Sequence, residues 1–239
     1  MSPPDFSALD AVGLNLQAVF NLTELPEPLR ERVLHATCPQ AGFRQLILIG
    51  NAGPVLWRAL CADGIDDDDP IDAFSVREVN RWFEQQYPGR TQHRLYPGNT
   101  PVNLQQLGQH AGWHHDSPFK VGIQAELGTW FAYRVALLAD TTLHPTPPVR
   151  TRSPCSDCAD TPCIRNCPAD AMAGGGFALD ACIDYRQQPG SRCADTCVAR
   201  LACPVGDAHR YDAAQIHHGY AHSLRMIKWF AAHRETQID

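Results

Sequence analysis

The sequence has no apolar stretch long enough to cross a membrane, and its first residues lack the basic-then-apolar order of a secretory signal peptide. Its longest apolar runs, such as residues 46–49 and 135–139, fall far short of the ~20 residues that a membrane helix needs. Basic residues are also in deficit, because 26 acidic against 20 basic side chains give a formal charge of −6. That balance is poorly suited to gripping nucleic acid through its phosphates. We therefore expect a cytoplasmic protein with neither a membrane nor a nucleic acid as its partner.

Cysteine is nearly absent from the first 154 residues, which contain only Cys38 and Cys61, whereas eight cysteines fall between residues 155 and 203. A secreted disulfide scaffold would spread its cysteines along the chain. Thiols gathered in one short stretch of a cytosolic protein indicate soft metal ligands instead, as in zinc or iron–sulfur sites. Cys38 and Cys61 are expected to be ordinary buried thiols.

The chain is not short of apolar residues, because 44% of its 239 residues are hydrophobic and 19% are charged. This composition excludes a disordered chain and allows a sizeable core. The patterning predicts an α+β protein, in which residues 1–145 form an α/β domain. Residues 146–205 are expected to form a cysteine-rich module, and residues 206–239 a C-terminal helix that packs on the rest. The proline- and threonine-rich residues 141–154 predict an extended linker.

Alternation of apolar and polar residues locates the individual elements of the first domain. Prolines near the start of two apolar segments favour helix beginnings. Strands are predicted at residues 14–20, 46–49, 120–124 and 130–138, and helices at residues 27–35, 54–61, 71–86 and 102–112.

Two related cysteine patterns follow one another. The first is Cys155-x2-Cys158-x4-Cys163-x3-Cys167-Pro168, and the second is Cys182 followed by Cys193-x3-Cys197-x5-Cys203-Pro204. In bacterial ferredoxins, three closely spaced cysteines are followed by a Cys-Pro whose sulfur binds the other cluster. The same crossover here predicts one [4Fe–4S] cluster on Cys155, Cys158, Cys163 and Cys203, and a second on Cys167, Cys182, Cys193 and Cys197. Two structural zinc sites, each held by four thiolates, are the alternative.

Two further segments carry a resemblance to known families. Gly128-Thr129-Trp130-Phe131, with Leu137-Leu138 after it, resembles a G-x-W-F-x5-L-L pattern of the epoxyqueuosine reductases and the cobalamin-processing chaperones. Cys182-Ile183-Asp184-Tyr185 is similar to the C-I-x-Y setting of an isolated cysteine in epoxyqueuosine reductases and reductive dehalogenases. The resemblance implies a nitroreductase-like α/β domain that holds a corrinoid (cobalamin), followed by a bacterial two-[4Fe–4S] ferredoxin-like module.

The implied function is that of an iron–sulfur oxidoreductase, in which the clusters feed electrons one at a time to the corrinoid or to a small-molecule substrate. An external electron donor such as a flavodoxin, a ferredoxin or a reductase would supply them. His114 and His115 are candidates for the metal face, because imidazole is a common axial ligand. The alternative for these two histidines is a polar turn without a ligand role. The other candidate cofactor-binding residues are Gly128, Trp130, Phe131, Tyr133 and Arg134. For the aromatic residues among them, the alternative is packing of a buried strand in the core.

Two features separate the chain from epoxyqueuosine reductase. The proposed catalytic aspartate of that family precedes a Pro-Val-like segment, but the matching Gly98-Asn99-Thr100-Pro101-Val102 has no carboxylate. Larger members also carry C-terminal helical repeats that help to grip tRNA, whereas one helix is expected after Cys203. No catalytic residue is identified. The alternatives to a corrinoid-type reductase are a non-enzymatic ferredoxin-type electron-transfer or corrinoid-handling protein and, further off, an epoxyqueuosine reductase-like tRNA-modifying enzyme.

Overall fold

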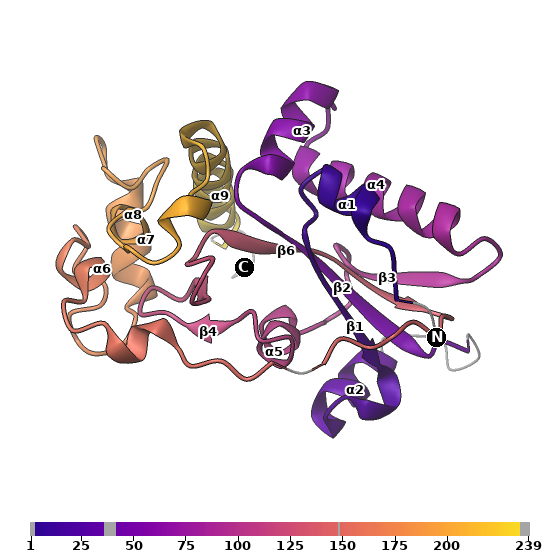
Figure 1. Cartoon of the computed structure of the whole chain (residues 1–239). Helices are drawn as coiled ribbons and strands as arrows, with labels where there is room; N and C mark the ends of the chain where they lie inside the picture. The colour runs from indigo at the N-terminus through magenta and orange to yellow at the C-terminus, as the bar shows by residue number, and fades with distance from the viewer. Residues whose placement is uncertain (1–2, 36–41, 148, 235–239) are drawn as a thin grey trace. The chain divides into compact units, whose positions relative to one another are not determined.

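The computed structural model describes residues 3–35, 42–147 and 149–234 and has an α+β fold (Figure 1). The chain divides into two compact units. Unit 1 consists of Met1–His114 and Trp130–Thr151, and unit 2 of His115–Thr129 and Arg152–Asp239. Each unit therefore combines two stretches that are separate in sequence. Within the described residues, no helix has both the length and the apolar character of a membrane span.

Unit 1 is built on a four-stranded antiparallel sheet with the strand order β1-β2-β6-β3. The two central strands, β2 and β6, are almost wholly buried because helices cover both faces of the sheet. The strands are β1 (Leu16–Asn21), β2 (Gln45–Ala52), β3 (Gln92–Tyr96) and β6 (Phe131–Ala139).

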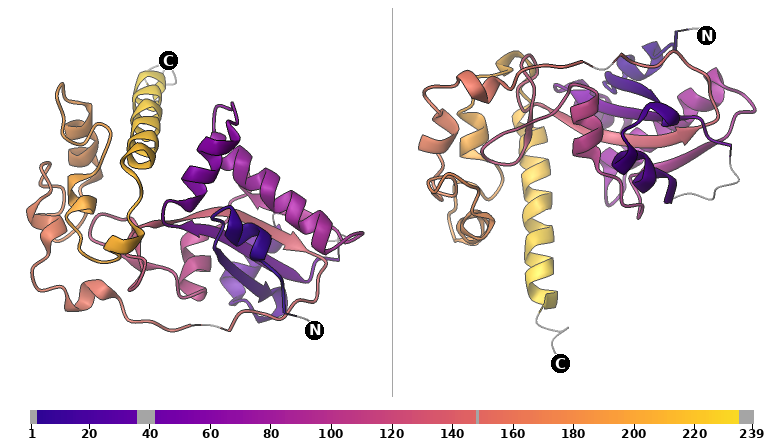
Figure 2. Two further views of the ribbon diagram at one scale, coloured as in Figure 1. Left: turned by 45° about the horizontal axis from the view of Figure 1, so that its top comes forward. Right: turned by 90° about the horizontal axis from the view of Figure 1, so that it is seen from below.

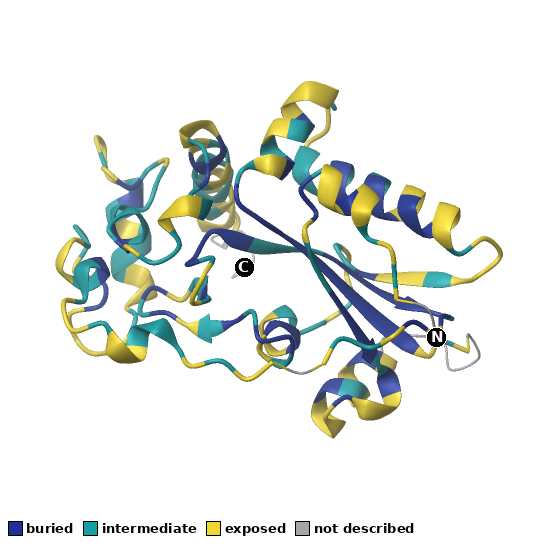
Figure 3. Ribbon diagram, in the orientation of Figure 1, coloured by how far each residue is buried: buried dark blue, intermediate teal, exposed yellow. Residues whose placement is uncertain are grey.

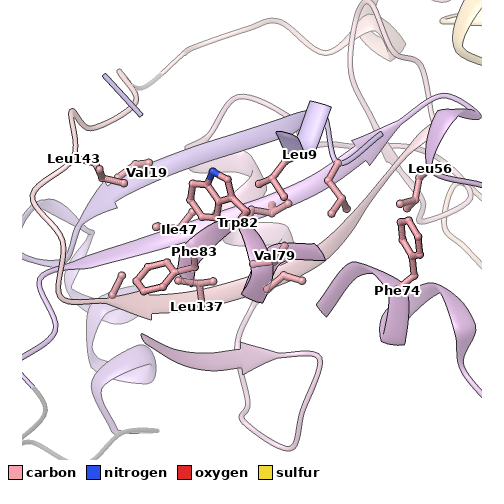
Figure 4. Close-up of a cluster of buried hydrophobic side chains, with 14 of the residues drawn as sticks. Leu9, Val19, Ile47, Leu56, Phe74, Val79, Trp82, Phe83, Leu137 and Leu143 are labelled. Atoms are coloured by element: carbon pink, nitrogen blue, oxygen red, sulfur yellow. The ribbon is translucent and has the colours of Figure 1, made fainter. Parts of the chain in front are cut away.

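Alternate side chains of each strand face opposite sides, so the sheet separates two apolar clusters. On one face, Ile47 and Ile49 meet α1 (Ser7–Ala11), α3 (Val55–Asp63) and α4 (Pro70–Gln86), whose Trp82 and Phe83 fill much of the space (Figure 4). On the other, Leu46 and Leu48 meet α2 (Glu27–His35) and α5 (Leu104–His110). A short 3-10 turn, η1 (Leu22–Glu24), precedes α2.

Residues 141–147 differ from the free linker that their composition predicted. The backbone N–H of Thr146 donates to the Val19 carbonyl at 2.8 Å, and its hydroxyl accepts from the Val19 N–H at 2.9 Å. Leu143 is buried in the core, and the buried Gln45 amide holds the backbone of Leu143 on both sides. The segment therefore covers the outer edge of β1, whose backbone groups would otherwise be open to pairing with another chain.

Unit 2 consists of short elements and one long helix, and Figure 3 shows most of it as half-buried or exposed. Its small apolar cluster consists of Phe119, Cys163, Met172 and Ala199. Its strands are β4 (His115–Asp116) and β5 (Gly122–Ile123), which pair with each other, and its helices are η2 (Pro154–Asp157), α6 (Pro162–Arg165), α7 (Leu179–Gln187), α8 (Val198–Leu201), η3 (Asp207–His209) and α9 (Ala213–Arg234).

Every strand and helix predicted from the patterning is present, although the predicted strand at residues 120–124 is reduced to β5 and one further bridge. The patterning missed α1, β3 and β4, and it predicted none of the helices α6, α7 and α8 of the cysteine region. The predicted C-terminal segment 206–239 contains α9, which begins at Ala213 and is one long helix (Figure 2).

Candidate functional site

All eight cysteines of unit 2 are free thiols. Four of them lie together around Cys163 on α6. Burial raises the pKa of the Cys163 thiol, and the neighbouring thiols of Cys203, Cys155 and Cys158 raise it further. Burial also raises the pKa of Cys155, again with Cys203 and Cys158 beside it. Because α6 packs against α8, the turn that follows α8 brings Cys203 to this first cysteine group.

The second cysteine group lies around Cys182 on α7. Burial raises the pKa of the Cys182 thiol, and Cys197, Cys167 and Cys193 are its thiol neighbours. All four line one cavity of about 120 Å³. A water molecule occupies ~30 Å³ and packed interiors leave few voids larger than that, so the space exceeds what side-chain packing alone leaves empty. Its other walls include Phe119, Val121, Met172, Phe177 and Tyr220.

The buried Arg186 joins the parts of the chain that surround this cavity. Its guanidinium donates to the Cys193 carbonyl at 3.1 Å, to the Ser223 hydroxyl at 3.1 Å and to the Tyr220 carbonyl at 2.9 Å. Arg186 thereby ties α7 and α9 to the cysteine-bearing loop. Sequence reasoning missed it, although its position one helical turn after Cys182 was a usable signal.

Within the described residues, no three His, Cys, Asp or Glu side chains converge closely enough to hold a single metal ion. The second cysteine group instead lines one cavity with four sulfur donors, and the four thiols of the first group are neighbours of one another. This donor set fits an iron–sulfur cluster, in which each thiolate binds a different iron. The backbone N–H of Arg200 also donates to the Cys197 sulfur at 3.4 Å, the kind of hydrogen bond that tunes a cluster.

Gly128 marks a close crossing of two backbone segments in unit 2. It has φ +60°, and a Cβ built there would lie 1.9 Å from the Val205 carbonyl oxygen. Gly206 faces it with φ +72°, and its Cβ would lie 2.2 Å from the Gly128 nitrogen. Arg200 on α8 adds hydrogen bonds to the hydroxyl and the carbonyl of Thr129. The glycine of the G-x-W-F pattern is therefore required by packing within unit 2.

Tyr133 is the centre of a polar and aromatic group in unit 1. Its hydroxyl lies 3.0 Å from Nδ1 of the buried His114, and the two rings stack at 6.3 Å. Gly108 leaves the room for that hydroxyl, because a Cβ there would lie 1.9 Å from it. Burial raises the pKa of Tyr133 well above its usual value. Phe131 meets the Tyr133 ring edge-on at 6.0 Å.

The other candidate residues are more dispersed. Trp130 is fully buried and Phe131 is 6% exposed, so both rings serve the core in this structure. Arg134 is half-buried, and its Nε donates to the buried Asn51 side-chain oxygen at 2.7 Å. His115 pairs with Ile123 in the ribbon of unit 2. The structure thus brings together His114, Phe131 and Tyr133.

The expectation that Cys61 is a buried thiol is wrong. Cys61 is exposed on α3, because the buried face of that short helix is formed by Leu56 and Leu60. Cys38 lies outside the described residues.

No protein-family model matches the chain, and no curated protein matches its sequence. Solved structures do match. An epoxyqueuosine reductase in complex with a tRNA-Tyr epoxyqueuosine-modified stem loop is 12% identical, with a TM-score of 0.57 over 88% of this chain and 66% of that one. An epoxyqueuosine reductase from Streptococcus thermophilus is 14% identical, with a TM-score of 0.53 over 86% of this chain and 66% of that one. The catabolic reductive dehalogenase NpRdhA, in complex with 3-bromo-4-hydroxybenzoic acid, is 13% identical, with a TM-score of 0.50 over 91% of this chain and 33% of that one.

The chain therefore has the fold of epoxyqueuosine reductases and of a reductive dehalogenase, which confirms the resemblance drawn from its G-x-W-F and C-I-x-Y segments. It spans slightly less than two thirds of the matched epoxyqueuosine reductases and about one third of the dehalogenase.

Proposed function

We propose that the protein is an iron–sulfur oxidoreductase that passes electrons through two [4Fe–4S] clusters in unit 2 to an acceptor held by unit 1, a corrinoid-type cofactor or a small molecule. The observation that carries the proposal is the separation of eight free thiols into two groups of four. Each group takes three cysteines from one sequence pattern and its fourth from the other, as bacterial ferredoxins do. The ligands would be Cys155, Cys158, Cys163 and Cys203 for one cluster, and Cys167, Cys182, Cys193 and Cys197 for the other.

Clusters in these sites would supply one-electron transfer, while the chain supplies burial and fixed sulfur positions. Arg186 holds the Cys193 loop against α7, and apolar walls such as Phe119 and Met172 keep water from the second cysteine group. Burial and hydrogen bonds to sulfur are two of the means by which a protein sets a cluster potential.

The decisive experiment is iron and acid-labile sulfide analysis of anaerobically purified protein, with electron paramagnetic resonance. We expect about eight irons and eight sulfides per chain. Cys163→Ser and Cys182→Ser should each remove about half of the iron, because each disrupts a different group. Cys61→Ser is the matched control, since Cys61 is an exposed thiol of unit 1, and it should keep the full content. Stoichiometric zinc without sulfide would instead establish the structural-zinc alternative.

For the acceptor in unit 1 we propose a contact with Tyr133, which is half-buried on β6, whereas the half-buried Arg134 is held by Asn51. The contact with His114 Nδ1 orients the Tyr133 hydroxyl, and the buried Trp130 and Phe131 hold the beginning of β6 in place. Support comes from the shared fold with a reductive dehalogenase and epoxyqueuosine reductases. Anaerobic titration with cob(II)alamin should shift the corrinoid spectrum and quench tryptophan emission. If neither changes with excess cobalamin, the acceptor is a different small molecule, and the cluster proposal stands on its own test.

Nucleic acid stays open as a substrate for one reason. A structure of this fold was solved with a tRNA stem loop, so the fold gives no support to the expectation, drawn from the net charge, that RNA plays no part. Binding of an RNA stem loop to the purified protein, measured by fluorescence anisotropy at near-physiological salt, tests this alternative directly.

A further inference from the structure

The C-terminal helix α9 has an unusual charge composition. None of its 22 residues is acidic, although the whole chain carries a formal charge of −6. It contains Arg225, Lys228 and Arg234, together with four histidines. The charged side chains of this helix are thus all basic, which favours a partner with negative charge at its surface.

The second half of α9 also exposes large apolar side chains. Met226 is 40% exposed, Trp229 50% and Phe230 56%, and their spacing of three and four residues places them on one stripe. Trp229 stacks on His233 at 4.3 Å and meets Phe230 edge-on at 4.9 Å. Arg225 lies one helical turn before Trp229, at the edge of this stripe, and Lys228 lies one turn after Arg225, further round the helix. We call these five residues the α9 stripe. Exposed apolar side chains gathered in this way mark an interaction site.

The first half of α9 belongs to the second cysteine group. Tyr220 lines the cavity that those four thiols share, and Arg186 binds the backbone of Tyr220 and the hydroxyl of Ser223. Trp229 follows Tyr220 by nine residues, which is ~14 Å along a helix that rises 1.5 Å per residue. A partner seated on the α9 stripe would therefore lie close to that cysteine group.

We propose that the α9 stripe is the docking surface for an acidic one-electron carrier protein that reduces the cluster held by the second cysteine group. This inference rests on the proposed function. In the step, the [2Fe–2S] or flavin centre of the carrier loses one electron and the oxidised [4Fe–4S] cluster gains it, with no bond made or broken. Acidic groups on the carrier would complement Arg225 and Lys228, and its apolar surface would cover Trp229 and Phe230.

A protein partner fits this surface better than RNA does. Trp, Phe, Met and Arg are the residue types enriched at the centre of protein interfaces. Affinity for RNA, in contrast, grows with the number of phosphates neutralised, and the stripe has only Arg225 and Lys228 to offer. The negative charge on the rest of the chain would work against a dense polyanion.

The test measures how fast a reduced plant-type [2Fe–2S] ferredoxin, an acidic carrier, reduces the clusters of the full chain in anaerobic stopped flow. Arg225→Glu/Lys228→Glu should lower the second-order rate constant at least tenfold at 0.01 M salt, where the Debye length is ~30 Å. At 1 M salt, with a Debye length of ~3 Å, the double variant and the wild type should converge. Trp229→Ala/Phe230→Ala should weaken saturation with ferredoxin while keeping the wild-type salt dependence.

Two controls separate the possible failures. Arg32→Glu/Arg150→Glu makes the same change of four charge units at two exposed arginines of unit 1 and should lower the rate far less. Dithionite should reduce the clusters of every variant equally, because it needs no docking surface. Wild-type ferredoxin rates in the charge-reversed variant would overturn the docking inference alone, whereas absence of any dithionite-reducible cluster would overturn the proposed function. Loss of RNA stem-loop binding in these variants, with unchanged ferredoxin rates, would assign the stripe to RNA and also overturn the inference.

Discussion

The glycine crossing in unit 2 gives a quantitative prediction for Gly128→Ala. A Cβ at φ +60° costs ~1–2 kcal/mol by itself. The new atom would also lie 1.9 Å from the Val205 carbonyl oxygen, which belongs to the backbone and cannot rotate away. Gly128 would have to move by more than an ångström, straining its two reciprocal hydrogen bonds with Gln124, of 2.8 and 2.9 Å. At ~1 kcal/mol for each bond, the substitution should cost about 3–4 kcal/mol in total.

Two other glycines of unit 2 separate the components of this cost. Gly190 has φ +73° but open space around its Cβ position, so Gly190→Ala should cost only the ~1–2 kcal/mol of the left-handed backbone. Gly174 has open space and no positive φ, so Gly174→Ala should stay within ~0.5 kcal/mol of wild type. Urea unfolding of the anaerobically purified protein, with amide hydrogen exchange of residues 115–129 to localise the effect, measures all three. A Gly128→Ala protein as stable as Gly190→Ala would show that the two segments do not meet at this distance.

Three further changes test the polar contacts. Arg186→Met removes three hydrogen bonds and should lower the free energy of unfolding of unit 2 by about 3 kcal/mol in urea titrations, whereas an unchanged midpoint would contradict the contacts. A hydrogen bond from Arg77 holds the pKa of Asp63 below its usual value of 3.8. The ionised pair therefore stabilises the folded state above this pH, and the stabilisation is lost as the pH falls through the lower pKa of the folded state. Calorimetry should therefore show a higher Tm for wild type than for Asp63→Asn near pH 6 and a shrinking difference below about pH 4; a constant difference would refute the pair. Tyr133→Phe should cost about 1 kcal/mol and shift the ring resonances of His114, and unchanged resonances would argue against the 3.0 Å contact.

The elements of unit 1 were predictable where their signal is local. Residues 27–35 begin near prolines and repeat their apolar residues at helical spacing, and α2 has the predicted bounds. Strand β3 was missed because it lies at the sheet edge, where only Leu95 is buried and His93 and Arg94 are exposed. An edge strand of this kind has too few apolar residues to produce a period of two.

The face of Tyr133 was beyond prediction from the sequence. Simple alternation would place Tyr133 on the same face as Val135 and Leu137. In the structure, Ile49 is opposite Val135 and Gly50 is opposite Tyr133, so Arg134 is an extra residue in β6. This bulge turns Tyr133 to the opposite face, where it packs with the cluster under α5. The bulge depends on the register with β2, a long-range property that a single strand does not encode.

The cysteine region shows the opposite balance between local and long-range information. The cysteine spacing predicts two sets of ligands, and the same two sets of thiols are neighbours in the structure, while their binding of clusters stays a prediction. The side chains that hold those groups in place could not be predicted, since Arg186 acts through residues more than thirty positions away on α9. The composition of the sequence also gives no sign of the unit boundaries at residues 115 and 130. Residues 115–129 belong to unit 2 through long-range backbone contacts, such as that of Gly128 with Val205.

Cysteine has two roles in unit 2 under the proposed function. The two hydrophobic clusters of unit 1 consist of aliphatic and aromatic side chains, so unit 1 is stabilised by burial of apolar surface. The hydrophobic cluster of unit 2, in contrast, contains Cys163, and the side chains of Cys167 and Cys197 pack against it. The side chains that would bind iron are therefore part of the small core itself. Because a metal site stabilises the folded state by the free energy of binding, loading of the clusters and folding of unit 2 depend on the same residues, whereas unit 1 has no such dependence.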